Sequence, residues 1–207
     1  MNPSQIEISI NPLEDERLGA TPGWTPTVAE CRKMWELWDM PEHIQSHSLT
    51  VTRVSQCIAE LMKKTLLPDL DVQVVTAAAM LHDLAKFYTI LHGGSHSQIG
   101  AAWVQEQTRN PVLTRAVLHH VHWPFAMNLR SYPVSLIVCY SDKRVMHTEI
   151  VTLEERFADL QTRYGMNATA IKHIQESLEQ GQSIERLLSA EMKVEFNAYS
   201  FDCRRMV

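Results

Sequence analysis

From Val28 almost to the end of the chain, apolar residues recur every three or four positions, which is the period of an amphipathic helix. Only 7 of the 207 residues are glycine, and no segment alternates apolar and polar residues as a half-buried strand does. Because 45% of the residues are hydrophobic, the chain can build a substantial core. The pattern therefore predicts an all-α protein.

The first 27 residues differ from the rest of the chain. They contain four prolines and two glycines and show no helical period, so residues 1–27 are predicted to form an irregular N-terminal arm. Residues 28–165 are predicted to form the main helical domain. Residues 166–207 are predicted to form a C-terminal helical extension packed on that same domain.

Capping signals predict several helix boundaries in the first half of the chain. Pro41 suits the first turn of a helix that ends before Pro68, and Asp71 is a suitable N-cap for the next helix. Ser95 begins a Ser-x-x-Gln capping box, which predicts a third helix start. Asn110, with the proline that follows it, begins another helix.

The second half of the chain shows the same kind of signals. One predicted helix carries an inner stripe from Val134 through Asp142 to Glu149. Thr152 begins a Thr-x-x-Glu capping box, and Gly165 is a typical helix stop. Residues 167–180 and 183–190 are predicted as two further helices.

Charge and hydropathy exclude two classes of partner. The net charge of −5 provides no basic field for nucleic acid, and no apolar run approaches the ~20 residues of a membrane span. The N-terminus lacks the charged region and apolar core of a secretory signal. The four cysteines form no Cys-x-x-Cys pair, which favours reduced thiols in a cytoplasmic protein.

Polar residues interrupt the apolar faces of five predicted helices. Seven of the ten histidines lie between residues 82 and 147. On each of five helices, one histidine or aspartate occupies a position where the period expects a core residue: His47, His82, His96, His120 and Asp142. A single such histidine is usually a hydrogen-bonded core residue. Imidazole and carboxylate groups that converge from several helices, however, are what a transition-metal site needs.

The order and spacing of these residues resemble a known family. His47, the His82-Asp83 pair and Asp142 follow one another as in the HD superfamily of metal-dependent phosphohydrolases. The segment LHDLAK is similar to the HDIGK signature of its common bacterial branch, and YSDKRV is similar to that branch's ADK motif. The resemblance extends from about Met40 to about Tyr164 and implies an HD-domain helical bundle.

The resemblance implies roles for the matching residues. His47, His82, Asp83 and Asp142 would hold a first metal. Asp83 and Lys86 are the predicted catalytic residues, because the two oxygens of Asp83 can bridge two metals. Lys86, one turn after His82, is placed to contact a phosphate oxygen as a point charge.

In the binuclear branches of the family, two further histidines hold a second metal. The segments HSQIGA at His96 and VLHHV at His119 and His120 are similar to those two elements. His120 is favoured over His119, because His119 lies about 100° round the helix from the apolar face. His92, on the same loop as His96, is an alternative ligand.

The resemblance implies hydrolysis of a nucleotide or other small phosphate ester or anhydride by metal-activated hydroxide. The cofactor would be one or two divalent transition metals, Fe, Mn, Co, Ni or Zn. No GYP motif follows HHVHWP, which argues against a cyclic-dinucleotide phosphodiesterase. Two alternatives remain open: an HD-type di-iron oxygenase and a non-catalytic, metal-stabilised regulatory module. Arg53, Lys143 and Arg144 are further candidates to line a phosphate pocket.

Overall fold

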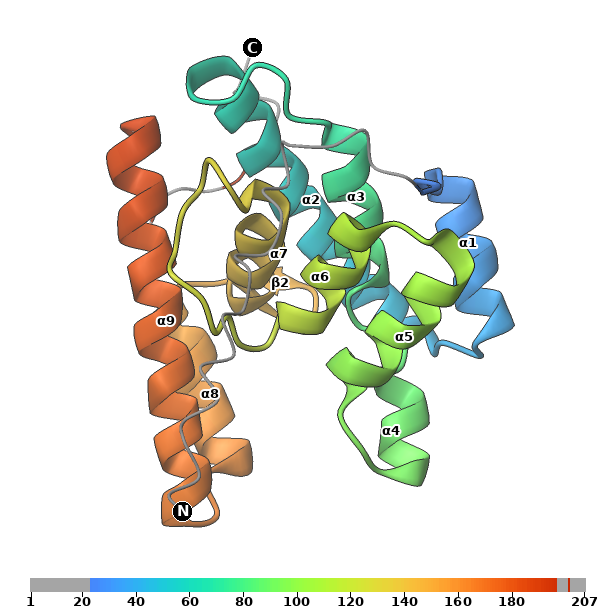
Figure 1. Cartoon of the computed structure of the whole chain (residues 1–207). Coiled ribbons are helices and arrows are strands. Elements are labelled where there is room, and N and C mark those ends of the chain that lie inside the picture. The colour runs from blue at the N-terminus through green and yellow to red at the C-terminus, as the bar shows by residue number, and fades with distance from the viewer. Residues whose placement is uncertain (1–22, 197–200, 202–207) are drawn as a thin grey trace, which may run out of the picture.

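The structure, a computed structural model, describes residues 23–196 and residue 201, which form a helical bundle with one small β-hairpin (Figure 1). The predicted all-α fold is therefore confirmed. The elements follow one another as α1 (Val28–Leu37), α2 (Glu42–Thr65), α3 (Val72–Leu81), α4 (Lys86–His92), α5 (His96–Thr108), α6 (Pro111–His119), α7 (Pro133–Lys143), β1 (Val145–Met146), β2 (Glu149–Ile150), α8 (Leu153–Tyr164) and α9 (Ala168–Met192).

Four helices, α2, α3, α6 and α7, pack against one another at the centre of the bundle (Figure 1). Their facing sides are apolar and fully buried, as Val54 on α2, Leu113 on α6 and Ile137 on α7 illustrate. Helices α1 and α5 lie on one side of this centre, and α8 and α9 lie on the other. The side chains that we discuss as a site therefore come from the best-packed part of the molecule.

Most of the predicted helix starts are confirmed. Pro41 is the N-cap of α2, one position before the predicted first turn. The Asp71 side chain accepts a hydrogen bond from the first turn of α3, and the Asn110 side chain does the same for α6. The capping box at Thr152 is present. Ser95 is the N-cap of α5, but its side chain makes no capping hydrogen bond, so the capping box predicted there is wrong.

The structure corrects two predictions about helix length. The helix predicted to reach Glu149 ends at Lys143, and Val145 and Glu149 lie instead on the two strands of the hairpin. The two predicted C-terminal helices are the single helix α9, which runs through Gly181. A Cβ atom at Gly181 would lie 3.2 Å from Lys143 Cδ. This glycine therefore allows close packing and does not end the helix.

The helix predicted to pass through the His82-Asp83 pair is also shorter than expected. Helix α3 ends at Leu81, residues 82–85 form a turn, and α4 begins at Lys86. The segment Val72–His92 as a whole is long and apolar enough to cross a membrane, but 67% of its most apolar window is buried inside the bundle. Its hydrophobicity is therefore accounted for by packing in the core.

The cysteines need one correction. Cys31 and Cys139 are free, as predicted, and both are buried, whereas Cys57 is disulfide-bonded. The prediction of reduced thiols is therefore wrong for Cys57. Spacing along the chain could not reveal this, because it does not show which thiols meet in space.

Candidate metal centre

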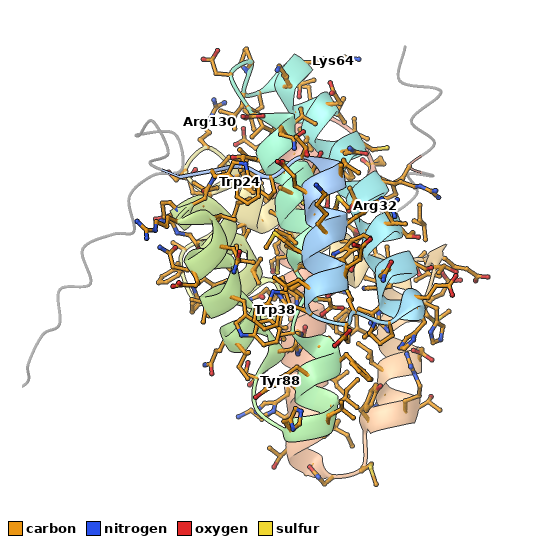
Figure 2. The ribbon with its side chains drawn as sticks, turned by 90° about the vertical axis from the view of Figure 1, so that its right-hand side faces the viewer. Trp24, Arg32, Trp38, Lys64, Tyr88 and Arg130 are labelled. Atoms are coloured by element: carbon orange, nitrogen blue, oxygen red, sulfur yellow. The ribbon has the colours of Figure 1, made fainter. Side chains whose placement is uncertain are left out.

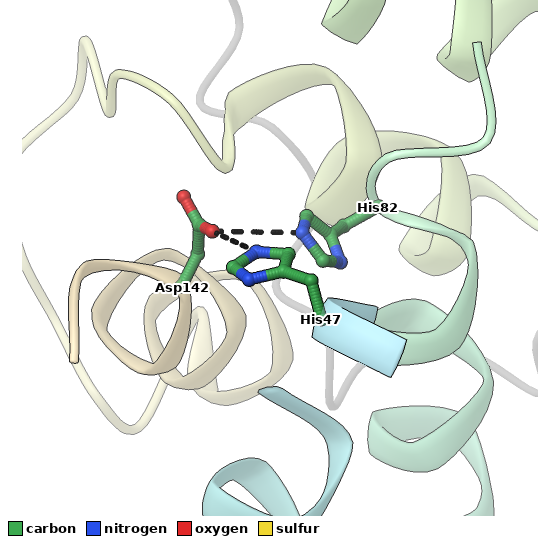
Figure 3. A group of neighbouring side chains, drawn as sticks. All are labelled: His47, His82 and Asp142. Carbon is green, nitrogen blue, oxygen red and sulfur yellow. Dashed lines mark hydrogen bonds and ion pairs between the residues drawn. The ribbon is translucent and has the colours of Figure 1, made fainter. Parts of the chain in front are cut away.

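Side chains from three elements meet on the inner side of the bundle (Figure 3). His47 extends from the second turn of α2, His82 caps the end of α3, and Asp142 lies in the last turn of α7. The Asp142 Oδ1 atom lies 3.0 Å from His47 Nε2 and 3.6 Å from His82 Nε2. Two imidazoles and a carboxylate thus present their ligand atoms to one small volume.

Asp83 lies between this trio and a pair of histidines. Its Oδ2 atom is 3.4 Å from His82 Nε2 and 3.9 Å from His47 Nε2. Its Oδ1 atom is 3.4 Å from His96 Nε2 and 3.6 Å from His120 Nε2. We call His47, His82 and Asp142 the first group, and His96 and His120 the second group. Each oxygen of Asp83 therefore faces a different group.

Backbone carbonyls fix the orientation of two of these rings. His82 Nδ1 lies 2.7 Å from the carbonyl oxygen of Ala79, three residues earlier, and His120 Nδ1 lies 2.7 Å from that of Val117. A carbonyl only accepts, so each Nδ1 carries the proton and donates it. The Nε2 lone pair of each ring is then directed at the centre, as in metal-binding histidines.

His47 is oriented in the same way, but from a distant part of the chain. Its Nδ1 donates to the carbonyl oxygen of His147, at 2.9 Å, in the turn of the β-hairpin. His147 has a φ of 56°, in the left-handed region that residues other than glycine rarely adopt. The hairpin therefore holds an uncommon backbone conformation at the point where it supports His47.

Two buried polar atoms in the centre have no hydrogen-bond partner among the described residues: His82 Nε2 and Asp83 Oδ1. An unsatisfied buried polar atom costs about 1–3 kcal/mol, so such atoms are uncommon. In addition, His96 Nε2 and His120 Nε2 face each other at 3.1 Å. Divalent cations would satisfy these atoms together, and imidazole nitrogens with carboxylate oxygens are the ligands that Zn, Fe, Mn, Co and Ni bind. The residues therefore fit a metal.

The electrostatics keep the carboxylates ionised. Burial alone would raise the pKa of Asp83, but His82 and Lys86 outweigh it and hold that pKa well below its usual range. Burial likewise opposes ionisation of Asp142, but the hydrogen bond from His47 and the nearby imidazole of His82 keep its pKa well below its usual range. Both carboxylates are therefore available to a cation at any pH near neutral.

His82 and His96 titrate differently. Burial opposes protonation of His82, but the neighbouring carboxylates of Asp83 and Asp142 outweigh it and raise its pKa to about 10. Burial lowers the pKa of His96 to about 4, and the neighbouring His120 acts in the same direction. His96 thus offers a neutral imidazole over the whole physiological range.

Comparison with protein families agrees with this geometry. A family model described as HD domain matches residues 44–161, which is more than half of the chain. The chain belongs to the HD-domain family. This match confirms the predicted superfamily, which consists in general of metal-dependent phosphohydrolases. No curated protein and no solved structure matches the chain.

Lys86 contacts the centre of the HD domain directly. Its Nζ atom donates a hydrogen bond to Asp83 Oδ2 at 2.6 Å, and 38% of its side chain remains exposed. Lys86 and Asp83 both line the pocket described below. The ammonium group therefore stands between the centre and the volume from which a substrate would approach.

The structure does not bring two of the predicted ligand candidates into either group. The His119 ring packs against the rings of Trp123 and Phe125, with centroids 5.6 and 5.3 Å away. The His92 ring lies on α4 against Tyr88, at 4.5 Å. The helix-face argument that favoured His120 over His119 therefore agrees with the geometry.

The predicted phosphate-binding role of Lys143 and Arg144 is not supported. Both are buried and hold the fold together. Lys143 Nζ donates to the carbonyl oxygens of His120 and Val121, at 3.2 and 3.0 Å. Arg144 donates to the carbonyl oxygens of Val151 and Phe196. Arg53 is exposed and does not line the pocket.

A pocket of about 910 Å³ opens onto the centre. It lies between the first turns of α2, the start of α4, the hairpin turn and one face of α8, and it reaches His47 and Asp83. Besides Lys86, three cationic or aromatic residues line it that were not predicted from the sequence: Arg156, Arg163 and Tyr164. A charged stripe on a helix normally indicates a solvated face, so no sequence signal distinguished these residues.

Proposed function

We propose that this HD-domain protein is a metal-dependent phosphohydrolase that acts on a nucleotide or another small phosphate ester or anhydride. The observation that carries the proposal is the position of Asp83. One of its oxygens faces the first group and the other faces the second, so one carboxylate can serve two cations. Membership of a metal-dependent hydrolase superfamily supports the same reaction class.

We assign the candidate ligands to two metals. His47, His82, Asp83 and Asp142 would hold one divalent cation, and Asp83, His96 and His120 would hold the other. When bound, such a pair of cations supplies a nucleophile from water near neutral pH and neutralises phosphate oxygens. Fe, Mn, Co, Ni and Zn all suit this set of ligands.

The protein's own groups position the substrate. Lys86 is fixed by its hydrogen bond to Asp83 and is partly exposed in the pocket, so its ammonium can donate to an oxygen of the reacting phosphate. Arg156 lines the same pocket and presents a planar fork of N–H donors that suits a phosphate. The phosphate would thus be bound between the metal centre on one side and the charged side chains of Lys86 and Arg156 on the other.

The experiment begins with protein purified without chelators and with its metals counted by mass spectrometry. Phosphate release is then measured from p-nitrophenyl phosphate and from nucleoside mono-, di- and triphosphates, with Mn²⁺, Co²⁺, Ni²⁺ or Zn²⁺ added. Release that depends on metal is the expected result. Asp142→Asn, which keeps the shape of the side chain, is the matched variant and should release little or none.

Oxygen consumption by the ferrous protein is measured in parallel. Oxygen consumption without phosphate release would contradict the proposal and favour the oxygenase. If neither reaction occurs in protein that retains its metals, the domain is a non-catalytic module. Either result leaves the metal centre in place and rejects only the proposed reaction.

A further inference from the structure

One face of α8 extends the pocket away from the metal centre. Arg156, Leu160, Arg163 and Tyr164 line the pocket at the spacing i, i+4, i+7 and i+8. Helix α8 follows the hairpin whose His147 carbonyl supports His47, and Figure 1 shows α8 leading away from that hairpin. Arg156, in the first turn, is therefore at the metal end, and Arg163 lies about 10 Å further along the helix axis.

The two arginines have more hydrogen-bonding capacity than their neighbours use. Both pair with the same carboxylate: Arg156 Nη1 is 3.5 Å from Asp159 Oδ2, and Arg163 Nη2 donates to the same oxygen. Only 13% of the Arg156 side chain is exposed. Each guanidinium carries five N–H donors, so one shared oxygen leaves most of them available to a ligand.

The α8 wall of the pocket is also positively charged. Its two guanidinium groups share the single negative charge of Asp159, which leaves one net positive charge. The carboxylates that line the pocket are Glu42 and Asp83, and Asp83 is already committed to the metal centre and to Lys86. An anion at the far end of the pocket would therefore be attracted by the net positive charge on α8, which is separate from the charges of the metal centre.

Apolar side chains separate the two cationic positions. Leu160 lies on α8 between Arg156 and Arg163, and Ile44 and Ile90 line the same pocket. The volume of about 910 Å³ is in the range of pockets that bind whole small molecules, and it exceeds what a single phosphate needs. The lining thus alternates from cationic to apolar to cationic over two turns of helix.

From this arrangement we infer that the pocket selects an organic bisphosphate. The reacting phosphate would lie at the metal end, near Lys86 and Arg156, and Arg163 would bind the second phosphate. Leu160 and Ile90 would contact the carbon body between them. Tyr164 supports Arg163, whose guanidinium carbon lies 5.4 Å from the centroid of its ring. The assignment of the reacting end rests on the proposed function, whereas the binding preference does not.

The test is a ratio of two affinities, measured by calorimetry on the full-length, metal-loaded protein. Adenosine 5′-monophosphate is compared with adenosine 3′,5′-bisphosphate, and fructose 6-phosphate with fructose 1,6-bisphosphate. At least one bisphosphate should bind about tenfold more tightly than its monophosphate, since a hydrogen-bonded charge pair contributes about 1.5–3 kcal/mol. Added salt should reduce this ratio, because Arg163 is partly exposed.

Arg163→Gln should reduce the ratio to nearly one. Arg130→Gln is the matched control: Arg130 is also a partly exposed arginine with one carboxylate partner, Glu191 at 3.6 Å, but it does not line the pocket. Figure 2 shows Arg130 near the opposite end of the molecule from Tyr88. Circular dichroism checks that both variants are folded. Equal ratios in all three proteins, or no binding of either bisphosphate to the wild type, would overturn the inference.

The result of this binding test can be distinguished from the result of the hydrolase test. If the protein binds a bisphosphate through Arg163 but releases no phosphate from any compound, the selectivity stands and the hydrolase proposal fails. If it hydrolyses mono- and bisphosphates equally and Arg163→Gln has no effect, the hydrolase proposal stands and the selectivity fails.

Discussion

The two groups of the metal centre are built differently, although they share Asp83. The first group comes from α2, the end of α3 and α7, and the His82 side chain is fully buried. The second group joins His120, at the end of α6, to His96, in the first turn of α5, and 28% of the His96 side chain is exposed. Each group therefore joins a buried histidine to a partly exposed ligand, but that ligand is the carboxylate of Asp142 in the first group and the imidazole of His96 in the second.

Charge balance separates the two groups further. At the first group, the negative charges of Asp83 and Asp142 outweigh burial and raise the pKa of His82 to about 10, so a protonated His82 can balance the charge of Asp142 without a metal. In the second group, burial and the neighbouring His120 lower the pKa of His96 to about 4, and His96 Nε2 faces His120 Nε2 without a carboxylate that belongs to this group alone. The second group thus depends more strongly on a bound cation for its organisation.

The largest effect should come from the residue that both groups share. Asp83→Asn keeps the side-chain shape but removes the charge that faces each metal, so both metals should be lost. The rate of phosphate release should fall at least about a thousandfold, because each lost Lewis acid costs several kcal/mol of transition-state stabilisation. Metal counting and steady-state kinetics measure this. A variant that retains both metals would show that Asp83 is not the bridge.

A smaller and more selective loss is expected from the second group. His96→Ala and His120→Ala should each remove about one metal equivalent and leave the metal of the first group bound. The rate should fall at least about a hundredfold, since the nucleophile is expected to need both cations. Metal content is measured by mass spectrometry and the rate by phosphate release.

His119→Ala is the control for that experiment. His119 is adjacent to His120 in the chain, but its ring packs against Trp123 and Phe125 and not toward Asp83. The His119→Ala variant should retain both metals and most of the activity. Full metal content in both the His96 and the His120 variants would instead indicate a mononuclear site.

The ligand groups could be anticipated from the sequence because they obey local rules. Helical periodicity placed four histidines and one aspartate on inner faces, and the family resemblance added Asp83: the five are His47, His82, His96, His120 and Asp142. The turn at residues 82–85 did not disturb this prediction, since α3 still carries the His82-Asp83 pair into the core.

Other features depend on contacts that no local rule describes. The carbonyl oxygen of His147 accepts a hydrogen bond from His47, 100 residues earlier in the chain. Such a backbone contact cannot be predicted from the pattern of side chains. The sequence pattern predicted that a helix ends at residue 180, just before Gly181, whereas the missing side chain of Gly181 makes room for Lys143 within one continuous helix. Arg156 and Arg163 were not singled out from the sequence, because only the fold shows that this face of α8 lines the pocket beside the metal centre.

Removal of the metals should lower stability as well as activity. A ligand present at about 100 times its dissociation constant stabilises the folded state by about 2.7 kcal/mol, which corresponds to about 5–10 °C in Tm for a chain of this size. We expect that loss when the wild type is treated with a chelator and followed by calorimetry. Asp83→Asn should show no further decrease on chelation, and an unchanged wild-type Tm after verified metal removal would argue against a buried site.

The smallest expected effect tests how the second group is held in place. Lys143 follows Asp142 in the chain, and its ammonium donates to the carbonyl oxygens of His120 and Val121, just beyond the end of α6. Helix α7 therefore supplies a ligand to the first group and a backbone clamp to the second. Lys143→Met keeps the length of the side chain but removes these hydrogen bonds.

The Lys143→Met variant should bind the second metal about tenfold more weakly, which is typical when a residue that orients a metal ligand is lost. Its affinity for the first metal should change much less, because Asp142 and its neighbours remain. Titration of metal-free protein with Co²⁺, followed by its absorption spectrum, resolves the two binding steps. Lys172→Met, which alters an exposed lysine on α9, is the control. Equal weakening of both steps would mean that Lys143 supports the bundle as a whole and not the second group in particular.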